Sequence, residues 1–209
     1  MQRIVWGRAT SSNVMKVLWG LGELGLPFER IDVGGSFGKT DTADYRAMNP
    51  TGLVPTLQED GFTLWESNAI LRHLCHAHAP QSSLWPQDPQ ARANVDRWMD
   101  AQQTQLNRPM GVVFWGLVRT PPDKRDPAAI AQGVADAAKA YGLIEPELAK
   151  HAYIAGPAFT LADIPWGVHA HRWFNMDFDR PPLPHVRAWY DRLCERPAYR
   201  QHIVACPIV

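Results

Sequence analysis

The feature that most constrains the fold is the stretch from Gly52 to Leu71, which reads Gly-Leu-Val-Pro-Thr-Leu, a polar turn, and then Leu-Trp-Glu-Ser-Asn-Ala-Ile-Leu. Its first half predicts a strand entered through Pro55, because proline lacks the N–H of a sheet ladder and is tolerated at an edge or a special turn. Its second half predicts another strand that leads directly into a helix, with Glu66 and Ser67 in the first turn. The stretch therefore places a proline-bounded strand beside a helix N-terminus.

These elements together suit a small zwitterionic peptide as a ligand. A cis bond at Val54–Pro55 is cheap, at about 0.5–1 kcal/mol before proline. It would turn the N–H and C=O of Val54 toward a ligand that pairs as an added strand. The helix start at Ser67 offers free amides, a hydroxyl and the positive end of the helix dipole to an anion. The carboxylate of Glu66 offers a partner to an ammonium group.

Val-Pro before a strand, followed by Glu-Ser-Asn-Ala-Ile at a helix start, resembles the glutathione-binding half of the cytosolic glutathione transferases. The resemblance extends over nearly the whole chain, through motifs in residues 1–78 and through the layout of helices in residues 89–209. It implies that glutathione is bound as a co-substrate and that its thiol is activated to attack a small hydrophobic electrophile. It also implies a homodimer.

The pattern along the chain agrees with the fold that this resemblance implies. Strand patterns occur at residues 3–7, 28–32, 54–58 and 62–64. With the helices between and after them, residues 1–78 have the βαβ-ββα order of a thioredoxin-like domain. Residues 79–88 contain two prolines and two serines and predict a linker. Residues 89–209 show no strand pattern, so the predicted fold class is α/β followed by an all-helical domain.

Two local signals refine the helical half. Thr160-Leu-Ala-Asp163 has the form of a capping box at the start of a buried helix, where the N-cap contributes about 1 kcal/mol. Pro109 predicts a kink or an interruption in the helix expected over residues 89–110.

Composition argues against several other classes of protein. Lys+Arg and Asp+Glu both number 21, and this zero formal charge argues against nucleic acid or a membrane surface held by bulk electrostatics. No apolar run approaches the length that spans a bilayer, and the N-terminus leads into a strand pattern, so neither a membrane segment nor a signal peptide is expected. The three cysteines are widely separated and form no CxxC, which indicates a reducing cytoplasm.

A transferase must convert the glutathione thiol into a thiolate at neutral pH. An unperturbed thiol has a pKa of about 8.5, and a hydroxyl hydrogen bond near a helix N-terminus is enough to lower it by one to two units. The family places this donor in the loop after the first strand. Here the loop offers Ser11, Ser12 and Asn13 but neither Tyr nor Cys.

Two alignments of this loop assign the donor differently. The pattern that ends at Lys16 resembles bacterial transferases with Ser-x-Asn-Val-x-Lys, which makes Ser11 the donor and Asn13 a second donor. A theta-like Ser-x-Pro-x-Arg pattern would choose Ser12, but this chain lacks its proline, so Ser11 is preferred. Plain N-capping of the following helix is the alternative structural explanation for these polar residues.

The resemblance assigns two further groups of residues. The glutathione-binding residues are Lys39, Leu53, Val54, Pro55, Glu66 and Ser67. A solvated lysine on a mobile loop is an equally good interpretation of Lys39. The candidates for the second-substrate pocket between the two halves are Phe114, Trp115, Arg119, Trp166, His169 and Trp173. Most large aromatic residues at helical spacing belong to the core, so each of these residues needs structural support.

No metal site is expected. His73, Cys75, His76 and His78 are close in sequence, but no second pair of ligands is spaced to complete a tetrahedral site. We expect these histidines to be solvated at the exposed end of the helix that starts near Ser67, where polar and cationic groups suit the helix dipole.

Two other functions remain open from the sequence. Related bacterial proteins with similar loops reduce disulfides with glutathione, and this activity is separated from conjugation by assaying a mixed disulfide against a chlorodinitrobenzene-type electrophile. The fold also serves in non-enzymatic interaction modules. That function predicts a disrupted glutathione site and failure to bind immobilised glutathione, whereas the Val-Pro and Glu-Ser elements are intact here.

Overall fold

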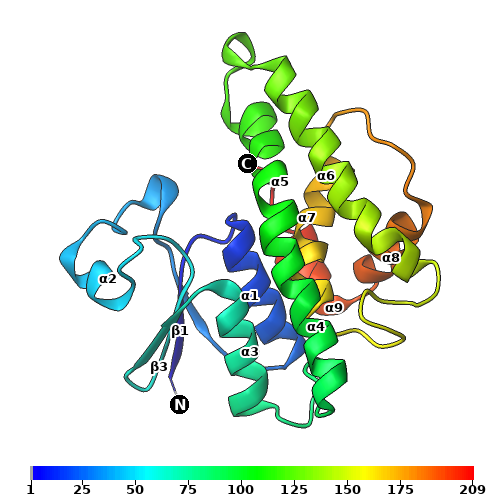
Figure 1. Cartoon of the computed structure of the whole chain (residues 1–209). Coiled ribbons are helices and arrows are strands. Elements are labelled where there is room, and N and C mark those ends of the chain that lie inside the picture. The colour runs from blue at the N-terminus through cyan, green and yellow to red at the C-terminus, as the bar shows by residue number, and fades with distance from the viewer. Residues whose placement is uncertain (1) are drawn as a thin grey trace.

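The computed structural model describes residues 2–209, which form an α/β half followed by a helical half (Figure 1). The sheet has the strand order β2-β1-β3-β4. Its strands are β1 (Arg3–Trp6), β2 (Glu29–Ile31), β3 (Thr56–Glu59) and β4 (Phe62–Trp65). β1 is parallel to β2 and antiparallel to β3, and β3 is antiparallel to β4. The predicted fold class is confirmed.

The helices of the first half pack against this sheet through apolar faces with helical periodicity. They are α1 (Ser12–Glu23), the short η1 (Gly35–Phe37), α2 (Ala43–Met48) and α3 (Ser67–His78). α1 buries an apolar face, made of Val14, Val17, Leu18 and Leu21, in a cluster with Leu57 of β3 and Ile70 of α3. This apolar cluster holds the starts of α1 and α3 at fixed positions beside the sheet.

The second half is helical. Its longer helices are α4 (Pro89–Ala101), α5 (Asn107–Phe114), α6 (Pro127–Leu148), α7 (Asp163–Asn175) and α8 (Pro184–Cys194). Shorter turns are η2 (Gln102–Leu106), η3 (Trp115–Arg119), η4 (Pro122–Lys124), α9 (Pro197–Tyr199) and η5 (Arg200–Val204). α7 lies at the centre, with almost every residue buried. Within residues 2–209 no helix is long and apolar enough to cross a membrane.

The helix that begins at Pro89 is interrupted, as Pro109 predicts. α4 passes into the π-helical turn η2 before α5 begins at Asn107. Pro109 cannot donate a hydrogen bond to the carbonyl of Gln105, and its ring crowds that carbonyl, so the backbone widens there. η2 places Gln102 and Gln103 toward the first half of the molecule.

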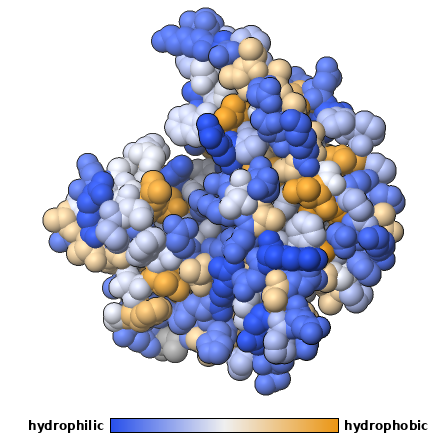
Figure 2. Space-filling view, in the orientation of Figure 1, coloured by the Kyte–Doolittle hydropathy of each residue, from blue (hydrophilic) through white to orange (hydrophobic). Residues whose placement is uncertain are grey.

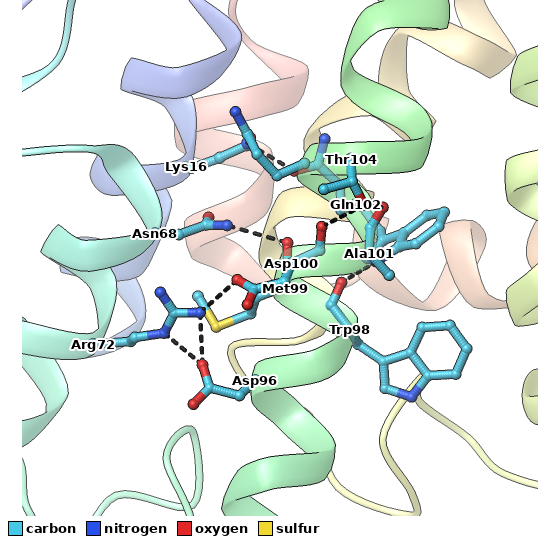
Figure 3. A network of polar contacts seen from close by, with 12 residues as sticks. Lys16, Asn68, Arg72, Asp96, Trp98, Met99, Asp100, Ala101, Gln102 and Thr104 are labelled. Atoms are coloured by element: carbon cyan, nitrogen blue, oxygen red, sulfur yellow. Dashed lines mark hydrogen bonds and ion pairs between the residues drawn. The ribbon is translucent and has the colours of Figure 1, made fainter.

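The two halves are joined by polar contacts between α3 and α4 (Figure 3). Asn68 Nδ2 donates to the carbonyl of Met99 at 3.2 Å. Arg72 forms ion pairs with Asp96 at 2.6 Å and Asp100 at 2.9 Å. Above them, the buried ammonium group of Lys16 on α1 donates to Gln102 Oε1 at 2.9 Å. These contacts hold α4 and η2 against α1 and α3.

The side-chain hydrogen bonds of the predicted capping box are present in the turn that leads into α7, which begins at Asp163. Thr160 N donates to Asp163 Oδ2 at 2.9 Å, and Ala162 N donates to the Thr160 hydroxyl at 3.3 Å. The other carboxylate oxygen of Asp163 accepts from Ile154 N at 3.0 Å and from the Trp189 indole N–H at 2.9 Å. Asp163 therefore connects the start of α7 to the preceding loop and to α8.

Candidate active site

The turn before β3 is organised by the buried side chain of Asn49. Its oxygen accepts from the N–H and the hydroxyl of Thr51, and its amide donates to the Leu53 carbonyl at 2.9 Å and to the Thr56 hydroxyl at 3.0 Å. The Val54–Pro55 bond that follows is cis. The N–H and C=O of Val54 have no hydrogen-bond partner within residues 2–209. A rigid turn thus presents a free backbone edge.

The start of α3 faces this edge. Ser67 is the first helical residue and is 5% exposed, and no side chain caps the helix. Glu66 has φ 72°, a conformation that costs a residue with a side chain about 1–3 kcal/mol. Leu53, Val54, Pro55, Glu66 and Ser67 line one cavity of about 170 Å³. Free helix amides, a hydroxyl and a carboxylate lie together there, as a zwitterionic peptide requires.

Lys39 does not join this cavity. It is exposed in the loop between η1 and α2, has φ 69°, and lines neither this cavity nor the larger one described below. Its assignment to a glutathione carboxylate stays a prediction.

The loop between β1 and α1 places Ser11 at the N-cap of α1. The Ser11 backbone is extended, and its hydroxyl makes no hydrogen bond to the amides of α1, so capping does not account for this side chain. The loop is held from the helical half, because Arg172 Nη2 donates to the Thr10 carbonyl at 2.9 Å. Asn13 lines both cavities, and its buried Oδ1 has no hydrogen-bond partner within residues 2–209. The loop therefore lies where the two cavities meet.

A larger cavity of about 500 Å³ lies between the two halves of the molecule. It extends from the Ser11–Asn13 loop to η3 and α7, and Figure 2 shows the outline of the molecule indented between the N-terminal half and the upper part of the helical half. Four of the predicted second-substrate residues line it, namely Phe114, Trp115, Arg119 and His169. Trp115 is 63% exposed, so an apolar surface faces the open cleft.

Two of the predicted pocket residues lie in the core instead. Trp166 is fully buried and donates its indole N–H to the carbonyl of Trp98 at 2.8 Å, and Trp173 is also fully buried. The prediction for Trp166 was wrong because α7 is surrounded by other helices, so most of its side chains pack internally rather than face the cleft.

The sequence reasoning missed Arg8 and Arg172, which also line the larger cavity, and Asn107, which lines both cavities. Arg8 lies just before the Ser11–Asn13 loop, and this position in the sequence could have identified it as a residue of the site. Arg172 lies three residues beyond His169, but only the packing of α7 against the Thr10 loop brings it to the site.

Lys16 is fully buried beside the cleft. Burial lowers the pKa of its ammonium group to about 7, and the nearby carboxylate of Glu66 partly opposes this shift. The Lys16 ammonium group also connects α1 to η2 through its hydrogen bond to Gln102. Lys16 lines neither cavity.

Comparisons with known proteins find relatives that match nearly the whole chain. The family model of the glutathione S-transferase N-terminal domain matches residues 10–77, and that of the C-terminal domain matches residues 127–192. Glutathione S-transferase GstB of Escherichia coli K12 is 44% identical over 207 residues, which cover 98% of each chain. The chain belongs to the glutathione S-transferase family.

Other family members are similar over the same length. Glutathione S-transferase 3 of Zea mays is 31% identical over 98% of this chain and 94% of its own. The theta class glutathione S-transferase of Xanthomonas axonopodis pv. citri, solved with glutathione bound, superimposes with a TM-score of 0.95 at 44% identity over 99% of both chains. The predictions of the family, of a glutathione transferase enzyme and of glutathione as co-substrate are confirmed.

The histidines near the end of α3 are not simply solvated. His73 and His78 are partly buried and bond to the carboxylate of Glu59 at 2.8 and 3.0 Å, and Arg3 pairs with the same carboxylate at 2.5 Å. The expectation was wrong for His73 and His78, because β3 places Glu59 beside the helix end, whereas His76 is exposed as expected. The ligand-type atoms of Glu59, His73 and His78 lie within 4.8 Å of one another. With Arg3 on the same carboxylate, they form a polar network.

This network predicts a pH dependence of stability. Burial raises the pKa of Glu59, but the bonds from His78, His73 and Arg3 outweigh it and hold the pKa below the ordinary value of a glutamate. A folded-state pKa below the unfolded value gives stability that is present above about pH 4.5 and is lost as the pH falls through the folded pKa. In urea unfolding at pH 7, we expect Glu59→Gln to lose about 1–3 kcal/mol.

The loss in Glu59→Gln relative to wild type should shrink as the pH is lowered toward 3.5. Glu147→Gln is the matched control, because Glu147 pairs at the surface with Lys150 at 3.6 Å and such pairs contribute about 0–1 kcal/mol. An equal loss at pH 7 and pH 3.5 would show that the charge of Glu59 is not what stabilises the fold.

Proposed function

We propose that this chain is a serine-dependent glutathione transferase in which Ser11 donates a hydrogen bond to the glutathione thiolate. The observation that carries this proposal is the free Ser11 hydroxyl at the start of α1, where the two cavities meet at Asn13. The backbone edge of Val54 pairs with the cysteinyl part of glutathione. The amides at Ser67 bind its γ-glutamyl carboxylate, and Glu66 binds the ammonium group.

The reaction then follows from the placement of the sulfur. The thiol loses its proton to solvent, and the hydrogen bond from Ser11 with the nearby α1 N-terminus favours the thiolate. Asn13 supplies a second donor through its side-chain amide. The sulfur attacks the electrophilic carbon held in the larger cavity, a carbon–sulfur bond forms, and the leaving group departs with its electron pair. Holding both reactants in one cleft lowers the entropic cost of their encounter.

The reaction type is tested with two substrates for the purified chain. We expect glutathione conjugation to 1-chloro-2,4-dinitrobenzene, followed by absorbance of the product. Faster reduction of 2-hydroxyethyl disulfide with no conjugation would assign the site to disulfide reduction. Failure to bind glutathione at all would favour a non-enzymatic role.

Removing the Ser67 hydroxyl is expected to weaken glutathione binding. A hydrogen bond to a charged group is worth about 1.5–3 kcal/mol, so Ser67→Ala should raise the glutathione Kd by about 10-fold or more in titration calorimetry. Ser83→Ala is the control, because Ser83 is exposed in the segment between α3 and α4. An unchanged Kd in Ser67→Ala would remove this residue from the anion site.

We further propose that the chain is a cytoplasmic homodimer. Exposed apolar side chains on the first half support an interface, with Leu53 67% and Phe62 49% exposed, and the three free cysteines suit a reducing compartment. Light scattering after size exclusion should give twice the mass of one chain. A single-chain mass at micromolar concentration would contradict the dimer.

A further inference from the structure

Three arginine side chains gather at the larger cavity without an ion-pair partner in the described part of the chain. Arg8, Arg119 and Arg172 all line it, and its lining contains no Asp or Glu. Val209, which carries the C-terminal carboxylate, also lines the cavity. Within residues 2–209, however, none of these three arginines lies within 4.0 Å of a carboxylate oxygen. Unpaired cations crowded together repel one another, so their proximity points to an anionic ligand.

Arg172 is buried, Arg8 is partly buried, and Arg119 is exposed at the cavity. Arg172 is 7% exposed and lies with its guanidinium 3.9 Å from the centre of the Phe114 ring. The guanidinium of Arg119 lies 5.6 Å from the centre of the same ring. The Nε of Arg8 is buried without a hydrogen-bond partner among the described residues. Burial and the other two arginines lower the pKa of Arg172 to about 10.

A second, independent observation concerns His169. Its side chain lines the same cavity, the residue is 2% exposed, and neither ring nitrogen has a hydrogen-bond partner within residues 2–209. Leaving a buried polar group unsatisfied is unfavourable. A hydrogen-bond acceptor on a ligand would pair with the N–H of this ring.

Aromatic side chains from both halves flank these polar groups. Phe37 of η1 is 49% exposed, Trp115 of η3 is 63% exposed, and both line the cavity. Exposed aromatic faces favour a flat ring as ligand. The cavity thus combines surfaces that stack an aromatic ring with guanidinium groups that bind a carboxylate or a sulfonate.

We propose that the second substrate is an aromatic electrophile that carries an anionic group, which Arg119 binds together with Arg8 and Arg172. This inference rests on the proposed transferase function and specifies its substrate class. The anionic group lies among the guanidiniums, and the electrophilic ring carbon faces the sulfur near Ser11. The thiolate forms a bond to that carbon, and a ring halide departs with its electron pair.

The test uses two electrophiles that differ only in one ring substituent, a carboxylate or a neutral carboxamide. They are 4-chloro-3,5-dinitrobenzoate and 4-chloro-3,5-dinitrobenzamide. The kcat/KM of each is measured at saturating glutathione and divided by the rate constant of its uncatalysed reaction with glutathione. We expect this ratio in the wild type to be at least about 10-fold higher for the benzoate, because charge-assisted hydrogen bonds are stronger than neutral ones.

Arg119→Gln should lower this benzoate preference by about 10-fold or more. Arg108→Gln is the matched control, because Arg108 is exposed on α5 and does not line the larger cavity; it should leave the preference unchanged. High salt should weaken the preference in the wild type, since ion pairs at an open cleft are screened.

Three outcomes would overturn the inference. Equal corrected rates for the two compounds would reject the anionic substrate class while leaving the transferase function intact. A raised KM for glutathione in Arg119→Gln and Arg8→Gln, with an unchanged benzoate preference, would assign the arginines to a carboxylate of glutathione itself. No catalysed reaction with either compound, nor with 1-chloro-2,4-dinitrobenzene, would reject the proposed function as well.

Discussion

Asp163→Ala is expected to lower the free energy of unfolding by about 3–6 kcal/mol, the largest stability loss that we predict. The carboxylate accepts hydrogen bonds from Ile154 N, Thr160 N and the Trp189 indole, all of them buried. Each buried donor left without a partner costs about 1–3 kcal/mol. The measurement is urea unfolding at pH 7.5, followed by tryptophan fluorescence.

The unfolding experiment is done at pH 7.5 because of the pKa of Asp163. Burial raises the pKa to about 6, against the bonds from Ile154, Thr160 and Trp189 that lower it. At pH 7.5 the group is therefore ionised and accepts every bond. Thr160→Ala is the graded comparison, because it removes the N-cap hydroxyl and should cost only about 1 kcal/mol. Equal losses in the two variants would mean that the capping box acts only locally and does not join α7 to α8.

Ser11→Ala is expected to lower turnover by about 10- to 100-fold at pH 6.5, with a change of less than about threefold in glutathione affinity. Without the hydroxyl, the bound thiol should lose one to two units of pKa depression. The loss should narrow toward pH 9, where the thiol ionises without help. Initial rates with 1-chloro-2,4-dinitrobenzene across this pH range provide the measurement.

Ser12→Ala is the matched control for this result. Ser12 lies one position further along and also lines the larger cavity. If Ser12→Ala lost turnover and Ser11→Ala did not, the theta-like alignment would be the correct one. If neither variant lost turnover, Asn13 would remain as the donor.

Local patterns predicted the elements of the fold, because a helix or strand records its burial in the spacing of its own residues. The strand patterns in residues 1–78 and the capping box at Thr160 are examples, and the structure contains both. The Val54–Pro55 and Glu66–Ser67 elements could be interpreted because the groups that act together lie close in sequence. The single cavity they line had to be found in the structure.

Contacts between distant positions could not be predicted in this way. Arg172 reaches the loop at Thr10 only through the packing of α7, and Glu59 meets His78 only through the placement of β3 beside α3. Trp166 was predicted to line the pocket but lies in the core. Helical spacing alone does not distinguish a buried face from one that lines a cleft. The grouping of Arg8, Arg119 and Arg172 at the larger cavity could not be predicted either, since only the fold brings these residues together.

We infer that this cleft binds glutathione and that Ser11 stabilises its thiolate. A pH titration of the ultraviolet absorbance of the thiolate tests this role, with glutathione bound to the wild type and to Ser11→Ala. We expect a bound-thiol pKa one to two units below the free value of about 8.5 in the wild type, and a return toward that value in the variant. The same depressed pKa in both proteins would contradict the role of Ser11, and an undepressed pKa in the wild type would contradict thiol activation at this site.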